Sequence, residues 1–232
     1  MIMKGIKKVI NSFTKGEKIL WISSVAFIVA AFLIFDRGNY LALTASLLGT
    51  TSLIFNAKGN PFGQVLIIIF SLIYAYISYT YAYYGEMITY VGMTAPMAVI
   101  SLVTWLRNPF KGNKSEVQVN KLSGKEIAFA AVLSVIVTII FYFILKKFNT
   151  SNLVTSTASV ITSFFAAYLT FRRSAFFALA FMLNDVVLIV LWSLAAADNP
   201  TYVSVIVCFV VFLSNDLYSF INWSRLQKKQ AE

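Results

Sequence analysis

Eight long apolar stretches, separated by short polar segments, limit what this chain can fold into. A helix needs about 20 predominantly apolar residues to cross the hydrocarbon core of a bilayer. Six of the stretches contain no charged residue, and the last two contain one aspartate each, Asp185 and Asp216. The pattern therefore predicts an all-α membrane protein with eight transmembrane helices. The predicted spans are residues 19–35, 38–57, 59–85, 87–106, 127–145, 148–171, 174–197 and 199–224.

Composition excludes most other kinds of protein. Of the 232 residues, 59% are apolar and only 12% are charged, whereas a soluble domain carries about a quarter charged residues. The chain has no histidine, which excludes zinc–histidine sites, Ser-His-Asp triads and histidine proton relays. The single cysteine, Cys208, allows no internal disulfide. The chain has no glycine-rich phosphate loop, so we expect no ATP hydrolysis. We also expect no cofactor and no metal site.

The positions of the basic residues predict the topology. Cytoplasmic loops of membrane proteins carry an excess of Lys and Arg. With the N-terminus in the cytoplasm, eight spans place 16 of the 19 basic residues inside and leave Arg37, Lys146 and Lys147 outside. We therefore expect a multi-pass protein of the inner (plasma) membrane with both termini cytoplasmic. The net charge of +10 is then explained by topology and anionic lipid, so nucleic acid is not an expected partner.

Two short sequence matches indicate an internal repeat. Thr44-Ala45-Ser46 matches Thr157-Ala158-Ser159, and Trp105-Leu106-Arg107 matches Trp223-Ser224-Arg225. Spans two to four and spans six to eight then form two parallel three-helix bundles, and span five links them. This is a 3+1+3 core, to which span one adds an extra helix. Parallel repeats of this kind place their ligand between the halves. The expected units are residues 1–37 (basic N-terminus and extra helix), 38–106 (first bundle), 107–152 (loop and linker helix), 153–224 (second bundle) and 225–232 (cytoplasmic tail).

Polar residues inside the spans mark a candidate binding site. Ionisable groups in a bilayer are costly, so Asp185 and Asp216 are the first candidates. On the eighth span, helical spacing puts Asn215 and Tyr218 on one stripe, one turn apart. Aromatic faces stack on a planar ring, while amides and carboxylates bond sugar hydroxyls, which favours a nucleoside-like small molecule as substrate. The candidate contact residues are Gln64, Phe181, Asn184, Asp185, Trp192, Asn215, Asp216 and Tyr218.

The two aspartates also permit other interpretations. They fit a buried hydrogen-bond network that binds no ligand. They also permit the hypothesis of an intramembrane aspartyl protease, in which two carboxylates share a proton. The signatures of that class, Tyr-Asp and Gly-x-Gly-Asp, are absent, and the spans contain no Ser-Lys pair. A channel is disfavoured because the spans carry neither a charged ring nor a filter-like loop.

Several further residues are expected to have structural roles. The serine run over residues 156–163 is typical of close helix packing. Trp105 and Trp223, at the inner ends of their spans, are expected to anchor the membrane interface. Pro96 lies in the middle of the fourth span and is expected to kink its helix.

Three motifs carry a resemblance to a known family. They are Asn-Asp-Leu-Tyr-Ser-Phe-Ile-Asn-Trp over residues 215–223, Gly-Glu-Met over 85–87, and Met-Thr-Ala-Pro-Met over 93–97 followed by Trp105. Together they resemble the PnuC family of vitamin transporters, over residues 38–225. The resemblance implies a SWEET-like core, a homotrimer and facilitated diffusion of nicotinamide riboside. The family's Asn-x-x-Tyr motif maps onto Asn215 and Tyr218.

Departures from the family pattern keep a second substrate open. The family's Trp-x-x-Trp motif aligns with Ala178 and Phe181, and Ala98 stands where many members have a polar Asn or Gln. A roomier site suits a larger base, so a deoxynucleoside, or thiamine or riboflavin as implied by related transporters, is the alternative. For either substrate the simplest mechanism is passive transport. Net uptake then requires a cytosolic nucleoside kinase that phosphorylates the substrate, because an apolar passage rejects the charged product.

Overall fold

Eight long helical stretches account for most of the structure. The computed structural model describes residues 13–80 and 84–232, and in that part of the chain eight helical stretches are long and apolar enough to cross a membrane. The predicted all-α membrane fold is therefore confirmed. The helices are α2 (Lys15–Phe35), α3 (Tyr40–Ala57), α4 (Phe62–Thr80), α5 (Tyr84–Thr89), the π-helical turn η1 (Tyr90–Thr94), α6 (Ala95–Arg107), α7 (Gly124–Lys147), α8 (Leu153–Phe171), α9 (Phe177–Asp198), the 3-10 turn η2 (Pro200–Tyr202) and α10 (Val203–Ala231).

Polar side chains cap the start of several spans. Thr14 and Glu17 form a reciprocal capping box at the start of α2, and the Asn39 side chain accepts from the backbone N–H of Ala42 at the start of α3. The first N–H groups of a helix have no partner inside it, so these caps satisfy donors that lipid cannot. These cap positions therefore fix where α2 and α3 begin.

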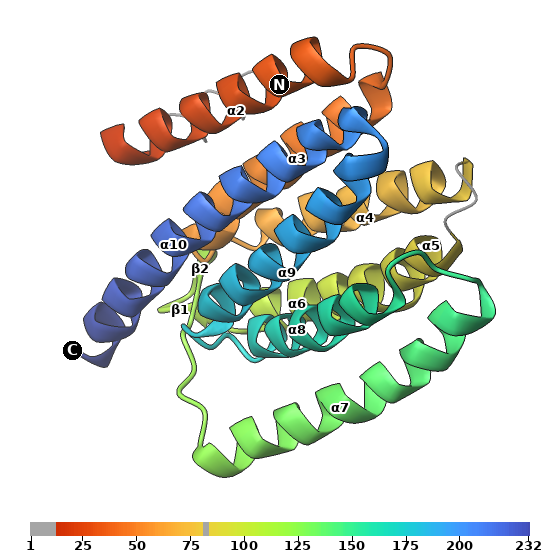
Figure 1. Ribbon diagram of the computed structural model, residues 1–232. Helices are drawn as coiled ribbons and strands as arrows, with labels where there is room; N and C mark the ends of the chain where they lie inside the picture. The colour runs from red at the N-terminus through yellow and green to blue at the C-terminus, as the bar shows by residue number, and fades with distance from the viewer. Residues whose placement is uncertain (1–12, 81–83) are drawn as a thin grey trace.

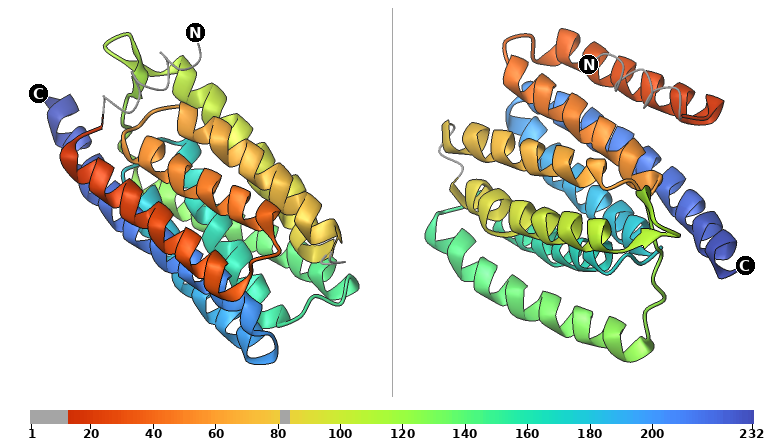
Figure 2. Two further views of the ribbon diagram at one scale, coloured as in Figure 1. Left: turned by 90° about the horizontal axis from the view of Figure 1, so that it is seen from above. Right: turned by 180° about the vertical axis from the view of Figure 1, so that it is seen from behind.

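Six of the helices form a closed ring. In order around it, α3 packs on α4, α4 on α6, α6 on α8, α8 on α9, α9 on α10, and α10 back on α3. Outside the ring, α2 packs against α3 and α10, while α7 packs against α8, so these two lie at opposite edges of the molecule in Figure 1. Figure 2 shows the same arrangement from two further sides. Helices of both predicted bundles therefore surround one shared interior.

The ring consists of the two predicted bundles, and their matching tryptophans join them. Trp105 Nε1 donates to the Thr170 carbonyl at the end of α8 (2.8 Å), and Trp223 Nε1 donates to the Asn56 carbonyl near the end of α3 (2.7 Å). Both indoles are fully buried, with ring centroids 5.3 Å apart. The expectation that Trp105 and Trp223 anchor the membrane interface is therefore wrong. Their N–H groups find carbonyl partners across the bundles, so the rings pack inside the protein.

The fourth span is interrupted by a wider turn. It consists of α5, the π-helical turn η1 and α6, and Pro96 lies in the first turn of α6. Proline has no N–H to donate, and the chain just ahead of it adopts the wider hydrogen bonding of a π-helical turn. Such turns are frequent at functional sites. Thr89, Tyr90 and Thr94, in and beside this turn, line the interior of the ring.

Loops and the end of α10 gather at one end of the ring, which we call the basic end. A short antiparallel hairpin, β1 (Pro109–Phe110) with β2 (Asn113–Val117), lies there between α6 and α7, in a segment where only a loop was expected. The Val117 N–H donates to the Gly59 carbonyl (2.9 Å), and the Gln230 side chain contacts the same hairpin. The Asn120 N–H donates to the Arg173 carbonyl just after α8 (2.9 Å), so the loops that follow α3, α6 and α8 pack as one layer.

The two ends differ strongly in charge. In the described part of the chain, 13 Lys and Arg residues lie at the basic end, whereas Arg37, Lys146 and Lys147 lie at the opposite end. This is the division that the charge pattern predicts. The remaining basic residues, Lys4, Lys7 and Lys8, lie outside the described residues.

Candidate functional site

A cavity of about 160 Å³ lies inside the ring, and all six ring helices line it. We call it the central cavity. Five phenylalanine rings form much of its wall: Phe70, Phe177, Phe181, Phe209 and Phe212. Its described polar lining is Asn56, Gln64, Glu86, Thr89, Tyr90, Thr94, Ser101, Ser159, Ser163, Thr170, Asn184, Asp185 and Asp216. A mostly apolar cleft with a few convergent polar groups is typical of a small-molecule site.

Five of the eight predicted contact residues meet at this cavity. Gln64 comes from α4, Phe181, Asn184 and Asp185 from α9, and Asp216 from α10. They lie far apart in sequence, yet the ring brings them to one space. Trp192, predicted to share their face, lies about two turns further along α9 and lines a different cavity.

The two aspartates form a carboxyl pair in the central cavity. Asp185 and Asp216 are 3% and 2% exposed, and their carboxyl groups lie close enough to interact with each other. Apart from that interaction, Asp185 Oδ2 and Asp216 Oδ1 have no hydrogen-bond partner in the described part of the chain. Two negative charges this close in a low-dielectric interior repel each other. A proton shared by the pair, or a cationic group beside it, would relieve this repulsion.

Amide side chains of the cavity are held by neighbouring polar groups. Gln64 Nε2 donates to Asn56 Oδ1 (2.9 Å), and Thr162 Oγ1 donates to Asn184 Oδ1 (2.8 Å). A Cβ atom at Gly63 would lie 2.2 Å from Asn56 Oδ1, so glycine at this position makes room for the first pair. These hydrogen bonds fix the orientations of the Gln64 and Asn184 amides at the cavity wall.

Asn215 and Tyr218 lie on a different face of α10 from the central cavity. Asn215 Nδ2 donates to Ser24 Oγ on α2 (2.9 Å), and the Tyr218 hydroxyl donates to Glu17 Oε1 (3.0 Å). Neither residue lines the central cavity. The predicted stripe exists, but α2 covers it, whereas Asp216, about 100° around the same helix, faces the ring interior.

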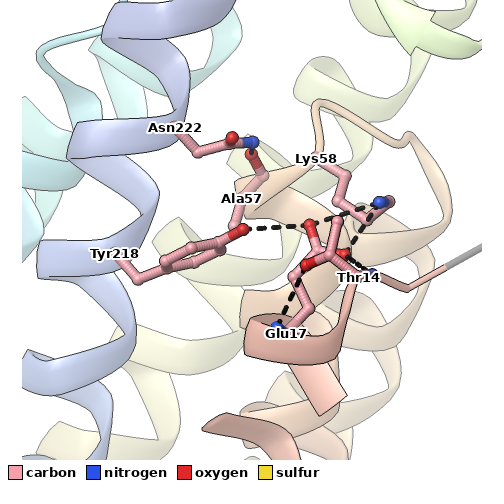
Figure 3. A network of polar contacts seen from close by, with 6 residues as sticks. All are labelled: Thr14, Glu17, Ala57, Lys58, Tyr218 and Asn222. Atoms are coloured by element: carbon pink, nitrogen blue, oxygen red, sulfur yellow. Dashed lines mark hydrogen bonds and ion pairs between the residues drawn. The ribbon is translucent and has the colours of Figure 1, made fainter. Parts of the chain in front are cut away.

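Glu17 is the centre of a polar network that attaches α2 to the ring (Figure 3). Its carboxylate is 3.0 Å from Lys58 Nζ and accepts from the backbone N–H of Thr14 (2.7 Å) as well as from Tyr218. Nearby, Asn222 Nδ2 donates to the Ala57 carbonyl (2.7 Å), as Figure 3 shows. Every one of these groups is satisfied by protein, so the network has a structural role.

Sequence reasoning missed several lining residues, and Glu86 is the most important. The charge pattern ends one predicted span at residue 85 and begins the next at residue 87, which places Glu86 between two spans. In the structure it belongs to the fourth span and lines the central cavity. Ser159 and Ser163, expected to serve close packing, also line it while bonding carbonyls of their own helix. The sequence signal that could have identified Glu86 as a lining residue is its position as a single carboxylate between two long apolar stretches.

The cavities of the ring are acidic. Two further cavities adjoin the central one toward the end opposite the basic end, and Glu86 lines all three. None of the described Lys and Arg residues lines any of them. Five of the chain's nine acidic residues do, namely Asp36, Glu86, Asp185, Asp198 and Asp216.

Two parallel three-helix bundles around a shared cavity define a multi-pass membrane transporter. A family model described as "Nicotinamide mononucleotide transporter" matches residues 39–225. The chain therefore belongs to this family, which consists of transporters and not enzymes.

Individual relatives agree with this assignment. The chain is 24% identical over 229 residues to the nicotinamide riboside transporter PnuC of Neisseria mucosa, covering 97% of this chain and 87% of that protein. The crystal structure of the vitamin B3 transporter PnuC superposes with a TM-score of 0.81 at 23% identity, covering 94% of each chain. The second likeness supports the fold and its helix arrangement.

Proposed function

We propose that this protein is a facilitative transporter of nicotinamide riboside. The names of the family and of the Neisseria relative point to this vitamin precursor or its mononucleotide. One structural observation supports the choice between substrates. The cavities carry five carboxyl groups and, among the described residues, no Lys or Arg. A cleft lined by one sign of charge concentrates solutes of the opposite sign.

Charge separates the candidate substrates. Nicotinamide riboside has a fixed positive charge on its pyridinium nitrogen and no phosphate. The mononucleotide adds a phosphate group with a charge of about −1.5 to −2, which the acidic lining repels. Deoxynucleosides are uncharged, so these carboxyl groups give them no advantage. The riboside therefore suits the cavities best.

The central cavity offers a complementary group for each part of this ligand. The Phe181 ring lies where it can stack on the planar pyridinium. Gln64 and Asn184 supply amide atoms for the carboxamide and the ribose hydroxyls. The carboxyl pair, Asp185 and Asp216, supplies the counter-charge. These assignments need no cofactor or metal.

Transport is proposed to follow from movement of the two bundles around this cavity. At the basic end, Phe177 packs on Trp223 with ring centroids 4.9 Å apart, beside Trp105, so buried aromatic rings close the cavity there. We place the basic end in the cytoplasm of the inner membrane, with both termini cytoplasmic, because the charge division supports that orientation. A homotrimeric assembly is proposed on family resemblance alone.

Reconstitution into liposomes tests the function. Vesicles that contain this protein alone should equilibrate nicotinamide riboside and should not concentrate it, even across a proton or sodium gradient. Enclosing a nucleoside kinase with ATP should produce apparent accumulation, because the phosphorylated product cannot leave. Equal uptake of the mononucleotide or of deoxynucleosides would contradict the substrate assignment. Accumulation driven by an ion gradient alone would contradict passive transport.

A further inference from the structure

A second cavity of about 320 Å³ adjoins the central one at the end opposite the basic end. We call it the outer cavity. Glu86 and Tyr90 line both cavities, so the two are neighbours along the ring axis. Residues of the connecting segments at that end, including Asp36, Asn199 and Thr201, also line the outer cavity. It therefore lies between the surface of that end and the central cavity.

Two pairs of aromatic rings stand in the wall of the outer cavity. Tyr74 of α4 and Tyr90 of η1 have ring centroids 5.2 Å apart, inclined by 35°. Trp192 of α9 and Tyr202 of η2 also lie 5.2 Å apart, inclined by 48°. The first pair comes from the first bundle and the second from the other. Aromatic walls of this kind bind organic cations by cation–π attraction.

Glu86 lies in this wall without a counter-charge. Its carboxyl group has no hydrogen bond or ion pair with any described residue, although it is largely buried and lies within a membrane span. It lines three adjoining cavities, so the accessible part of its side chain faces them. Glu86 lies in the first turn of α5, where a helix start favours an acidic side chain. That position supplies no full counter-charge, and a carboxylate within a span is costly without one.

We propose that the outer cavity is a second binding site, which holds an aromatic organic cation between Tyr74–Tyr90 and Trp192–Tyr202 with Glu86 as its counter-charge. The inference rests on the proposed function, because it places this site in series with the central one on the path of the same cationic solute. Because Glu86 lines both cavities, its carboxylate lies beside the cation as the cation moves from the outer site to the carboxyl pair. The solute then passes between them without losing a counter-charge.

Binding of 1-methylnicotinamide to the purified full-length protein tests the proposal. This probe keeps the charged pyridinium ring and lacks the ribose, and neutral nicotinamide is its matched control. Calorimetry should find binding of the cation, and Glu86→Gln should weaken the outer component about tenfold, the effect of roughly one charge or cation–π contact. Trp192 fluorescence should be quenched by the cation in the same concentration range. Trp192→Phe should remove that part of the quenching.

Matched variants separate this site from the central one. Glu232→Gln removes an acid outside the cavities and should leave the binding curve unchanged. Asp216→Asn should weaken the central component while the quenching of Trp192 remains. Unchanged cation binding and quenching in Glu86→Gln, with its thermal unfolding intact, would overturn the outer site. If that result occurs while the wild type still transports nicotinamide riboside, the proposed function stands and only this inference fails.

Discussion

Two sets of buried carboxyl groups in this protein have opposite surroundings. At the junction of α2 with the ring, Glu17 is fully partnered by Lys58, Tyr218 and Thr14. In the central cavity, Asp185 and Asp216 lie beside each other, and one oxygen of each has no hydrogen-bond partner among the described residues. Burial alone therefore does not distinguish a structural acid from a functional one. The distinction lies in whether the protein itself supplies the counter-charge.

The difference also separates the roles of the helices. α2 lies outside the ring and presents acceptors, the Glu17 carboxylate and the Ser24 hydroxyl oxygen. Donors from the end of α3 and from α10 bond to them, so α2 stabilises α3 and α10 from the outside. The six ring helices leave the carboxyl pair open to a cavity. We therefore expect the two sets of acids to give opposite results when each is neutralised.

The largest effect is expected for Asp216→Asn. The change keeps the shape of the side chain but removes a counter-charge for a cationic substrate, at a cost to binding of about 2–5 kcal/mol. Stability should stay the same or rise, since like-charge repulsion within the carboxyl pair is relieved. Substrate binding and thermal unfolding of the same preparation measure both quantities. Normal affinity for nicotinamide riboside in this variant would remove the pair from the site.

Glu17→Gln should behave in the opposite way. The variant loses charge-assisted bonds to Lys58 and Tyr218, which lowers the free energy of unfolding by about 1.5–3 kcal/mol, while substrate affinity changes little. Lys58→Met is the matched partner, and a double-mutant cycle of the two should show strong coupling. Denaturant or thermal unfolding in detergent measures the effect. A loss of affinity without a loss of stability would mean that α2 takes part in binding.

Tyr218→Phe should produce the smallest effect and tests the sequence motif directly. The variant keeps the ring and loses one hydrogen bond to Glu17, so a fall in stability of about 0.5–1.5 kcal/mol is expected. Transport in liposomes should remain close to wild type, because the hydroxyl faces α2 and not the central cavity. A strong transport defect with unchanged stability would restore Tyr218 to the binding site.

Much of the architecture follows from the sequence. Apolar length predicts eight spans, the distribution of Lys and Arg predicts two unequal ends, and the Trp105 and Trp223 motifs predict the two bundles. The reason is energetic. A charged side chain or an unpaired backbone polar group has a high free energy in lipid, so the sequence tolerates it at few positions within a span. The same argument made Asp185 and Asp216 candidates, and they do meet at the central cavity.

Only the tertiary structure decided which neighbour each helix face meets. Helical periodicity puts Asn215 and Tyr218 on one stripe of α10, but it gives α10 no direction in space, and α2 covers that stripe. The position of Glu86 also depends on tertiary structure. Hydropathy alone does not fix where a span begins, and in the structure the fourth span begins at Tyr84, ahead of Glu86. Local sequence determines which residues share a face. The contacts between distant helices determine whether that face meets lipid, another helix or a ligand.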